Sequence, residues 1–192
     1  MSNGGTGPTG TSSGSLFALL RADVEAATHP NFRLYSNRVF WTRALGKMIA
    51  SPGIRAVITF RIAHALAAKG LSPIALLLRA RALRRSGAEI HPRATIGPGL
   101  FLVHSSGVVI GPDVVIGARC RIHQGVTLGE PVHAGDGVWA APEVGDDVVL
   151  GAHAVLLGNV TVGDRATVGA NAVVTTDVAP DTRVAGVPAR PI

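Results

Sequence analysis

The chain has 192 residues, which allows one domain, or one domain with a small appendage. Hydrophobic residues make up 47% of it but aromatic residues only 4%, so the core is built from small aliphatic side chains. The net charge of +6 is unevenly divided, because residues 1–93 hold 13 basic and three acidic residues, a net charge of +10. No stacking aromatic residues accompany the densest basic segment, 79–85, so no nucleic-acid partner is expected, while a membrane surface stays open but unsupported.

The single cysteine, Cys120, rules out an internal disulfide and fits a reducing compartment. We therefore expect a cytoplasmic protein in which Cys120 fills the core. The sequence contains no run of 18 apolar residues, so no transmembrane helix is expected. Residues 1–15 are rich in Gly, Ser and Thr and lack the basic-then-apolar order of a signal peptide, so they are predicted to form a flexible tail.

Residues 16–88 are predicted to form an α-helical domain. Ser15 is a suitable N-cap for its first helix, and Gly70 is a suitable C-terminal signal for its third. The four expected helices cover about 16–27, 34–50, 54–68 and 72–85. Because so small a domain buries little core of its own, we expect it to pack on the open end of the following domain or on a copy of itself.

From residue 89 to 192, an aliphatic residue recurs mostly at every sixth position, usually followed by glycine. The series comprises Ile90, Ile96, Leu102, Ile110, Ile116, Ile122, Leu128, Val144, Leu150, Leu156, Val162, Val168 and Val174. This period predicts a parallel β-helix of hexapeptide repeats, in which three units make one triangular turn. The aliphatic side chains would stack inward on those of the next turn, and glycine suits a corner that needs unusual φ or close approach.

The sixfold register breaks twice. Leu102 and Ile110 are eight residues apart, and Leu128 and Val144 are sixteen apart, which we interpret as two units plus four extra residues. Insertions in a solenoid emerge as loops, often on the binding face. The last segment, 184–190, is Pro-rich and is predicted to leave the coil.

His104, within the first break, is the candidate catalytic residue. Imidazole takes and returns a proton near neutral pH without help. Counting back from Ile110 gives His104 an inward phase, but the break interrupts that count. Glu89, just before the first repeat, is a candidate carboxylate to orient the imidazole. A three-histidine zinc site is an alternative, but the His-x₄-His pair of zinc carbonic anhydrases with this architecture is missing, so no metal is expected.

Several segments resemble the serine acetyltransferases. They read AEIHPRATIG (88–97), HSSGVVIG (104–111), QGVTLG (124–129) and AGVPAR (185–190), with RIAHAL (61–66) in the helical part. The resemblance implies a left-handed parallel β-helix with an N-terminal α-helical domain. It also implies acetyl-CoA as co-substrate and a homotrimer or dimer of trimers with active sites between subunits.

The resemblance assigns roles to five positions. His104 takes the place of the catalytic histidine, which activates the acceptor hydroxyl, and Glu89 takes the place of the aspartate that orients it. Backbone around Ala152 and Ala170 lies where the family holds the pantetheine arm of the cofactor. Gly129, which remains from a glycine pair that follows Val-Thr-Leu in the family, is a third candidate cofactor-binding residue.

The serine-binding positions depart from the family pattern. Val103 occupies the position at which the family has an aspartate that binds the amine of serine. Ala141 occupies a position of the Arg-His pair with which the family binds the carboxylate of serine. The change is similar to relatives that acetylate sugar hydroxyls in exopolysaccharide assembly, and Trp139 could stack on a sugar or serve in packing. We expect an O-acetyltransferase with L-serine or a sugar or specialised-metabolite hydroxyl as acceptor, or, in another class, a non-catalytic binding solenoid. The tail that docks into cysteine synthase is missing, so that partner is not expected.

Overall fold

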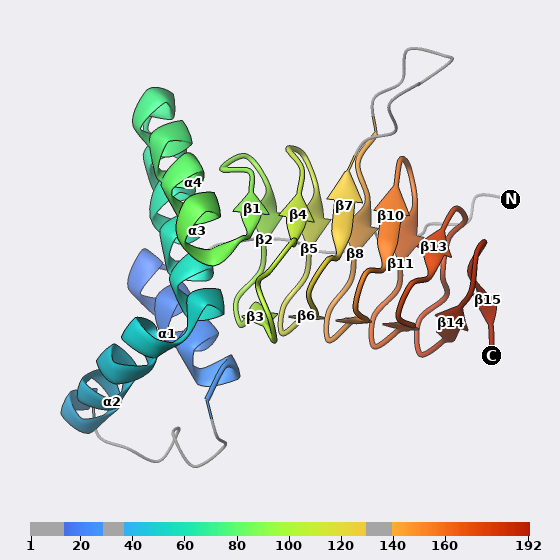
Figure 1. Cartoon of the computed structure of the whole chain (residues 1–192), viewed down its shortest axis with the longest axis horizontal. Helices are drawn as coiled ribbons and strands as arrows, with labels where there is room; N and C mark the ends of the chain where they lie inside the picture. Colours follow the sequence, from blue (N-terminus) through green and yellow to red (C-terminus); the bar gives the residue numbers. More distant parts are fainter. Residues whose placement is uncertain (1–13, 29–36, 130–139) are drawn as a thin grey trace, which may run out of the picture.

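The computed structural model describes residues 14–28, 37–129 and 140–192. Within these ranges, an α-helical part is followed by a three-sided coil of short strands (Figure 1). The helices are α1 (Leu16–Ala26), α2 (Asn37–Ala50), α3 (Pro52–Ala68) and α4 (Ser72–Ser86).

Local capping explains where these helices begin and end. The Ser15 hydroxyl accepts a hydrogen bond from the Ala18 backbone N–H at 3.3 Å, which confirms the predicted N-cap of α1. Helix α3 begins at Pro52, two residues before the predicted start. The Ser51 hydroxyl caps it, and proline is pre-organised for the first helical position. Gly87 ends α4 with a left-handed φ of 71°.

The strands form three sheets that are parallel except for β15, and from β1 to β13 successive strands pass from one sheet to the next. The first sheet is ordered β1-β4-β7-β10-β13, the second β11-β8-β5-β2 and the third β15-β14-β12-β9-β6-β3. The strands are β1 (Glu89–Ile90), β2 (Thr95–Ile96), β3 (Phe101–Leu102), β4 (Val109–Ile110), β5 (Val115–Ile116), β6 (Arg121–Ile122), β7 (Thr127–Gly129), β8 (Glu143–Val144), β9 (Val149–Leu150), β10 (Val155–Leu157), β11 (Thr161–Val162), β12 (Thr167–Val168), β13 (Val173–Val174), β14 (Arg183–Ala185) and β15 (Arg190–Pro191). The predicted parallel β-helix with helices before it is confirmed.

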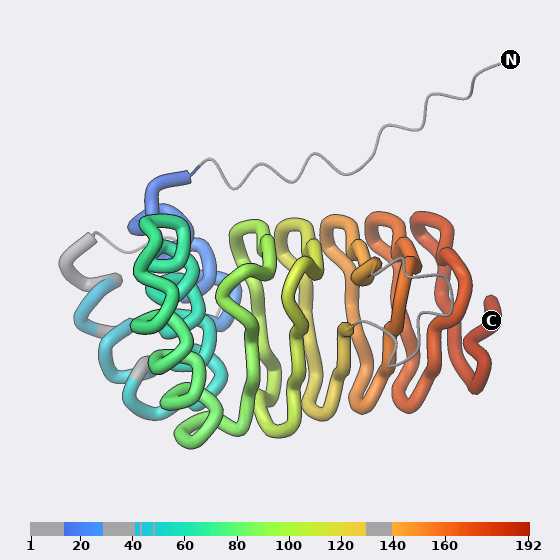
Figure 2. The backbone as a smooth tube through the Cα atoms, turned by 90° about the horizontal axis from the view of Figure 1, so that it is seen from above, coloured from blue at the N-terminus to red at the C-terminus, as the bar shows by residue number. Residues whose placement is uncertain are grey.

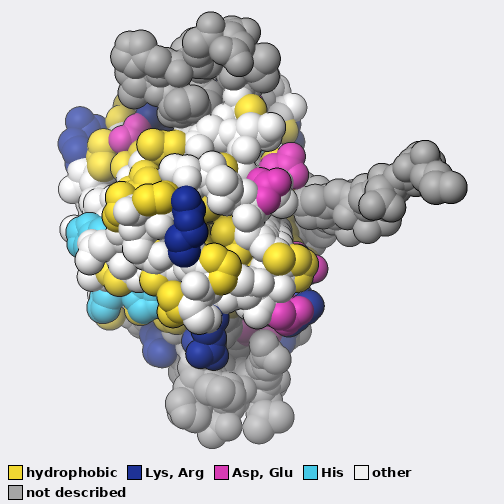
Figure 3. Space-filling view, turned by 90° about the vertical axis from the view of Figure 1, so that its right-hand side faces the viewer, with side chains coloured by type: hydrophobic (Ala, Val, Ile, Leu, Met, Phe, Trp, Pro, Cys, Tyr) yellow, Lys and Arg dark blue, Asp and Glu magenta, His cyan; other side chains and the backbone are white. Residues whose placement is uncertain are grey.

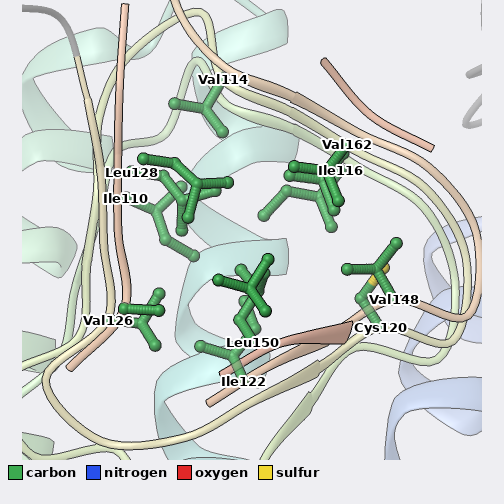
Figure 4. Packing of buried hydrophobic residues seen from close by; sticks show 14 of the residues in the cluster. Ile110, Val114, Ile116, Cys120, Ile122, Val126, Leu128, Val148, Leu150 and Val162 are labelled. Atoms are coloured by element: carbon green, nitrogen blue, oxygen red, sulfur yellow. The ribbon is translucent and has the colours of Figure 1, made fainter. Parts of the chain in front are cut away.

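The core runs along the inside of the coil. The predicted aliphatic positions, such as Ile116 and Leu128, are buried (Figure 4). A second inward set lies two residues earlier in each repeat, as in Val114 and Val126. Cys120 belongs to this second set and is completely buried, so its predicted role as a core residue is confirmed. Each turn therefore covers the apolar side chains of its neighbours.

The glycines after the aliphatic residues are explained by close approach of successive turns. A Cβ on Gly117 would lie 2.6 Å from the carbonyl carbon of Gly145, and one on Gly151 would lie 2.6 Å from the Ala170 nitrogen. Neither glycine has a positive φ. Of the two reasons for glycine at these positions, close approach is confirmed and unusual φ is not.

The second register break differs from its predicted length. Strand β8 continues in the second sheet directly after β7 in the first, so Leu128 and Val144 lie on adjacent sides of the coil. The insertion is therefore one unit plus ten residues, not two units plus four. A sixfold count cannot separate these alternatives, because both add up to the same spacing. The first break is confirmed as two extra residues between β3 and β4.

The C-terminal segment does not leave the coil as predicted. After β14 the chain reverses and β15 pairs antiparallel with it, with Ala185 opposite Arg190. Ala189 is buried, and its backbone N–H donates to the Val173 carbonyl at 2.8 Å. The segment thus covers the last turn, which would otherwise expose its apolar side chains and unpaired backbone groups.

The helical part covers the other end of the coil (Figure 2). A buried ion pair joins the two parts: the Arg61 guanidinium donates to both carboxylate oxygens of Asp23, at 2.8 and 3.1 Å. The same guanidinium donates to the carbonyls of Ile96 and Gly97, and the Asp23 carboxylate accepts from the backbone N–H of Gly99. The predicted packing on the open end is confirmed. Within the part of the chain that the structure describes, none of the helices is long and apolar enough to cross a bilayer.

Candidate functional site

One edge of the coil brings together three of the eight predicted site residues, His104, Ala152 and Ala170. At this edge, here called the His104 edge, the chain passes from the third sheet to the first. It carries His104 after β3, Gln124 after β6, Ala152 after β9 and Ala170 after β12. Since successive turns stack in register, these residues form a column parallel to the axis of the coil.

His104 lies on the outside of this edge. Its side chain is exposed, so the inward phase obtained by counting from Ile110 is wrong. His104 lies two residues after β3, at the corner position that Ala152 and Ala170 occupy in later turns, and neighbouring bonds fix the loop. The Ser105 hydroxyl donates to the Ser86 carbonyl at 2.7 Å, and the Gly107 N–H donates to the Gly87 carbonyl at 2.8 Å. No described residue makes a hydrogen bond to the imidazole.

Histidines are visible together when the coil is viewed from its C-terminal end. In that view their side chains gather at one side of the molecule (Figure 3). His153, like His104, is exposed on the His104 edge, and its ring lies close to the backbone of Gly125 in the preceding turn. Among the residues described, no group of three or more His, Cys, Asp or Glu side chains is arranged to hold a metal ion.

Glu89 lies in β1, beside the loop that carries His104. Its backbone N–H donates to the Val108 carbonyl at 2.8 Å. Its carboxylate forms an ion pair with Arg79 of α4 and has no hydrogen bond to His104. The orienting role of Glu89 therefore stays a prediction. Arg79 is a neighbour of the site that the sequence pattern did not identify, because α4 and β1 are brought together only by tertiary packing.

The rest of the His104 edge presents unpaired backbone and amide groups. The backbone N–H groups of Ala152 and Ala170 have no hydrogen-bond partner among the described residues. The side-chain Oε1 of Gln124 is buried and lacks a partner in the same set. An extended ligand that carries amide groups, as a pantetheine arm does, would satisfy the two backbone donors, since unpaired polar groups are costly once covered. The small side chains of Ala152 and Ala170 leave the backbone accessible.

Gly129 and Ala141 lie at a different edge, where the chain passes from the first sheet to the second. Gly129 ends β7, and its carbonyl accepts from the Gly158 N–H at 3.0 Å. Ala141 lies just before β8 and packs half-buried against the core. Trp139 lies outside the described residues. The first sheet separates this edge from the His104 edge, so one chain does not bring these residues to His104.

Val103 directly precedes His104 and is half-buried. Its backbone N–H donates to the Ile122 carbonyl at 2.9 Å. Side chains alternate along a strand, so Val103 lies on the outer face of the third sheet, as Phe101 does. The surface beside the imidazole on this side is therefore apolar, which differs from a carboxylate that would bind an ammonium group.

Comparisons with known proteins agree with this architecture. Residues 141–176 match the family described as bacterial transferase hexapeptide (six repeats), and residues 107–138 match the hexapeptide repeat of succinyl-transferase. A serine acetyltransferase of Helicobacter pylori (strain J99) is 42% identical over 148 residues, which are 76% of this chain and 84% of the relative. The chain belongs to the serine acetyltransferase family.

Solved structures of this family superpose on most of the chain. Soybean serine acetyltransferase complexed with serine is 36% identical, has a TM-score of 0.81, and is matched over 93% of this chain and 70% of its own. Serine acetyltransferase from Brucella abortus in complex with coenzyme A is 34% identical and has a TM-score of 0.79. The match covers 91% of this chain and 66% of the Brucella chain. The predicted left-handed β-helix is confirmed. The chain spans 59% of a Synechococcus elongatus serine acetyltransferase and 38% of Arabidopsis serine acetyltransferase 4.

Proposed function

We propose that this protein is an acetyl-CoA-dependent O-acetyltransferase with His104 as its general base. The observation that carries the proposal is the exposed imidazole at the head of a column of unpaired backbone donors, Ala152 and Ala170. Membership of the serine acetyltransferase family, including a relative in complex with coenzyme A, supports the same cofactor. Those N–H groups would hold the pantetheine arm of acetyl-CoA along the edge.

The proposed chemistry needs only one proton shuttle. A nitrogen of His104 takes the proton of the acceptor hydroxyl as its oxygen bonds to the thioester carbonyl carbon. The tetrahedral species then collapses, the carbon–sulfur bond breaks, and the imidazolium returns the proton to the leaving thiolate. The products are an O-acetyl ester and coenzyme A. Glu89 would orient the imidazole through its other nitrogen, once its carboxylate turns from Arg79.

Two acceptor classes fit the family and the altered residues. L-serine is the acceptor that the family suggests, and a structure of the soybean relative is complexed with serine. A sugar or specialised-metabolite hydroxyl is favoured by Val103 and Ala141, since neither side chain can pair with a charged group of an amino acid. Losing hydrogen bonds to charged groups costs about 1.5–3 kcal/mol each, so binding of serine would be weakened.

A homotrimer would complete the site. The outer face of the first sheet, between the His104 edge and the Gly129 edge, exposes apolar side chains, with Val109 37% and Leu157 41% accessible. If first sheets of three copies face a common axis, the His104 edge of one copy meets the Gly129 edge of the next. This arrangement buries those side chains and brings Gly129 and Ala141 of one copy beside His104 of the next. Size-exclusion chromatography would distinguish a trimer from a dimer of trimers. A pull-down would test docking to cysteine synthase, and cell fractionation would test a cytoplasmic location.

The test measures free thiol released from acetyl-CoA by purified protein with L-serine, L-homoserine and a panel of sugars, against a control without acceptor. Acceptor-dependent, saturable thiol release together with a mass gain of one acetyl group on the acceptor is expected. Saturation by serine at a high turnover would reject the sugar alternative. Thiol release that no acceptor increases would reject O-acetyl transfer and favour a non-catalytic solenoid.

A further inference from the structure

A polar cavity lies between the end of α1 and the outer face of the third sheet. It has a volume of about 380 Å³. Glu25 and Thr28 line it from the helical part, and Phe101, Arg121 and Val149 line it from three successive turns of the coil. These three are register partners, one above the other, so the sheet presents an aromatic ring, a guanidinium and an aliphatic side chain in a row.

The charges around this cavity are mostly neutralised by ion pairs. Glu25 pairs with Arg21 at 2.8 Å. Asp147 pairs with Arg119 at 2.6 Å, and the hydrogen bond from that guanidinium holds the pKa of Asp147 below its usual range. Arg121 is exposed and has no ion pair or side-chain hydrogen bond to any described residue. Its positive charge is therefore the uncompensated one in the described lining.

The cavity is adjacent to the proposed catalytic histidine. His104 follows Phe101 by three residues, or about 10 Å of extended chain. Val103 shares the outer face with Phe101 and joins the cavity to the His104 edge without an intervening charge. A ligand that contacts both Arg121 and the imidazole therefore lies along the outer face of the third sheet.

We propose that Arg121 binds an anionic group of the acceptor, and that the acceptor is a phosphorylated or carboxylated sugar. The inference rests on the proposed function and identifies the substrate class of that site. Guanidinium groups bind phosphate and carboxylate through paired hydrogen bonds, and both groups are common on sugars. Phe101 offers an apolar face to the ring, and the Thr28 hydroxyl can bond to its hydroxyl groups. The cavity volume is in the usual range for small-molecule sites.

The test is calorimetric titration of the full-length protein with glucose 6-phosphate, glucuronate and glucose. Arg121→Gln is the variant. Arg183→Gln is the matched control, because Arg183 is exposed on the same sheet two turns beyond Val149 and outside the cavity. We expect at least one anionic sugar to bind about tenfold more tightly than glucose. Arg121→Gln should remove about that factor, and Arg183→Gln should leave the affinity within twofold.

The two anionic probes separate a phosphate site from a carboxylate site, and either result supports the inference. Equal affinities for all three sugars, no binding of any sugar, or equal losses of affinity in the two variants would overturn the inference.

Acetyl transfer is measured separately. Saturable transfer to a neutral acceptor that Arg121→Gln does not alter leaves the proposed function intact and rejects the role of Arg121. Anion binding that depends on Arg121 without transfer to any acceptor rejects the function and keeps the binding site.

Discussion

The buried pair of Asp23 and Arg61 offers a direct test of how the helical part is held on the coil. The two side chains are 3% and 2% accessible. Asp23 accepts two hydrogen bonds from Arg61 and one each from the backbone N–H groups of Gly99 and Leu100, both at 2.9 Å. Asp23→Ala leaves a buried guanidinium and two backbone donors without this acceptor.

Removing one partner of a buried ion pair costs about 3–5 kcal/mol, because the remaining charge is uncompensated. With a urea m-value of about 2 kcal/mol per molar, the unfolding midpoint of Asp23→Ala should fall by about 1.5–2.5 M. Circular dichroism in urea, at one fixed protomer concentration, measures this shift. The same substitution should also impair binding in the cavity beside Thr28, because Asp23 fixes α1 against the coil.

Glu25→Ala is the matched control on the same helix. Glu25 forms a partly exposed pair with Arg21 four residues earlier, so its loss should cost only about 0.3–0.5 kcal/mol. The double variant Asp23→Leu/Arg61→Met removes both charges and should lose less than Asp23→Ala alone. If Asp23→Ala shifts the midpoint no more than Glu25→Ala does, the pair does not hold the two parts together.

Three further outcomes follow from single contacts. Gly125→Ala should destabilise the protein by about 1–3 kcal/mol in urea, because φ is +70° at this residue and a Cβ would lie 2.1 Å from the His153 ring. Adding His153→Ala should recover part of the lost stability, and no recovery would contradict the contact. Burial raises the pKa of Cys120 to about 12, so a thiol reagent at pH 8 should label it only on unfolding, and rapid labelling of folded protein would contradict this. Burial, and next the charge of Arg79, lower the pKa of His91, so the folded state binds its proton less readily than the unfolded chain. Stability should therefore fall as pH drops through about 6.5, and urea midpoints of His91→Asn should fall less; equal falls would show that His91 contributes nothing.

Much of the fold could be predicted because the core pattern repeats. Ile116 and its equivalents recur at a fixed spacing, and their burial follows from stacking alone. The sixfold count predicts the wrong length for the second insertion. A spacing of sixteen residues fits two assignments, which differ only in the sheet that Val144 joins. The antiparallel return of β15 was missed, since two residues without sixfold periodicity carry no signal of their partner.

The site was predictable only in part. The shared corner position of His104, Ala152 and Ala170 follows from their place in successive repeats. The ion pair of Glu89 with Arg79 depends on how α4 ends against the coil, which no local pattern encodes. Arg121 gave no sequence signal either, because its lack of a partner appears only when the carboxylates near it are paired with other arginines.

The central claim is that the imidazole at the head of this edge transfers the proton of the reaction. Steady-state thiol release by His104→Gln, measured against His153→Gln as a control on the same edge, tests it most directly. We predict that kcat of His104→Gln falls by a factor of about 10²–10⁴ with an unchanged unfolding midpoint, and that His153→Gln stays within a few-fold of the parent protein. Turnover by His104→Gln at the parent rate would contradict the account.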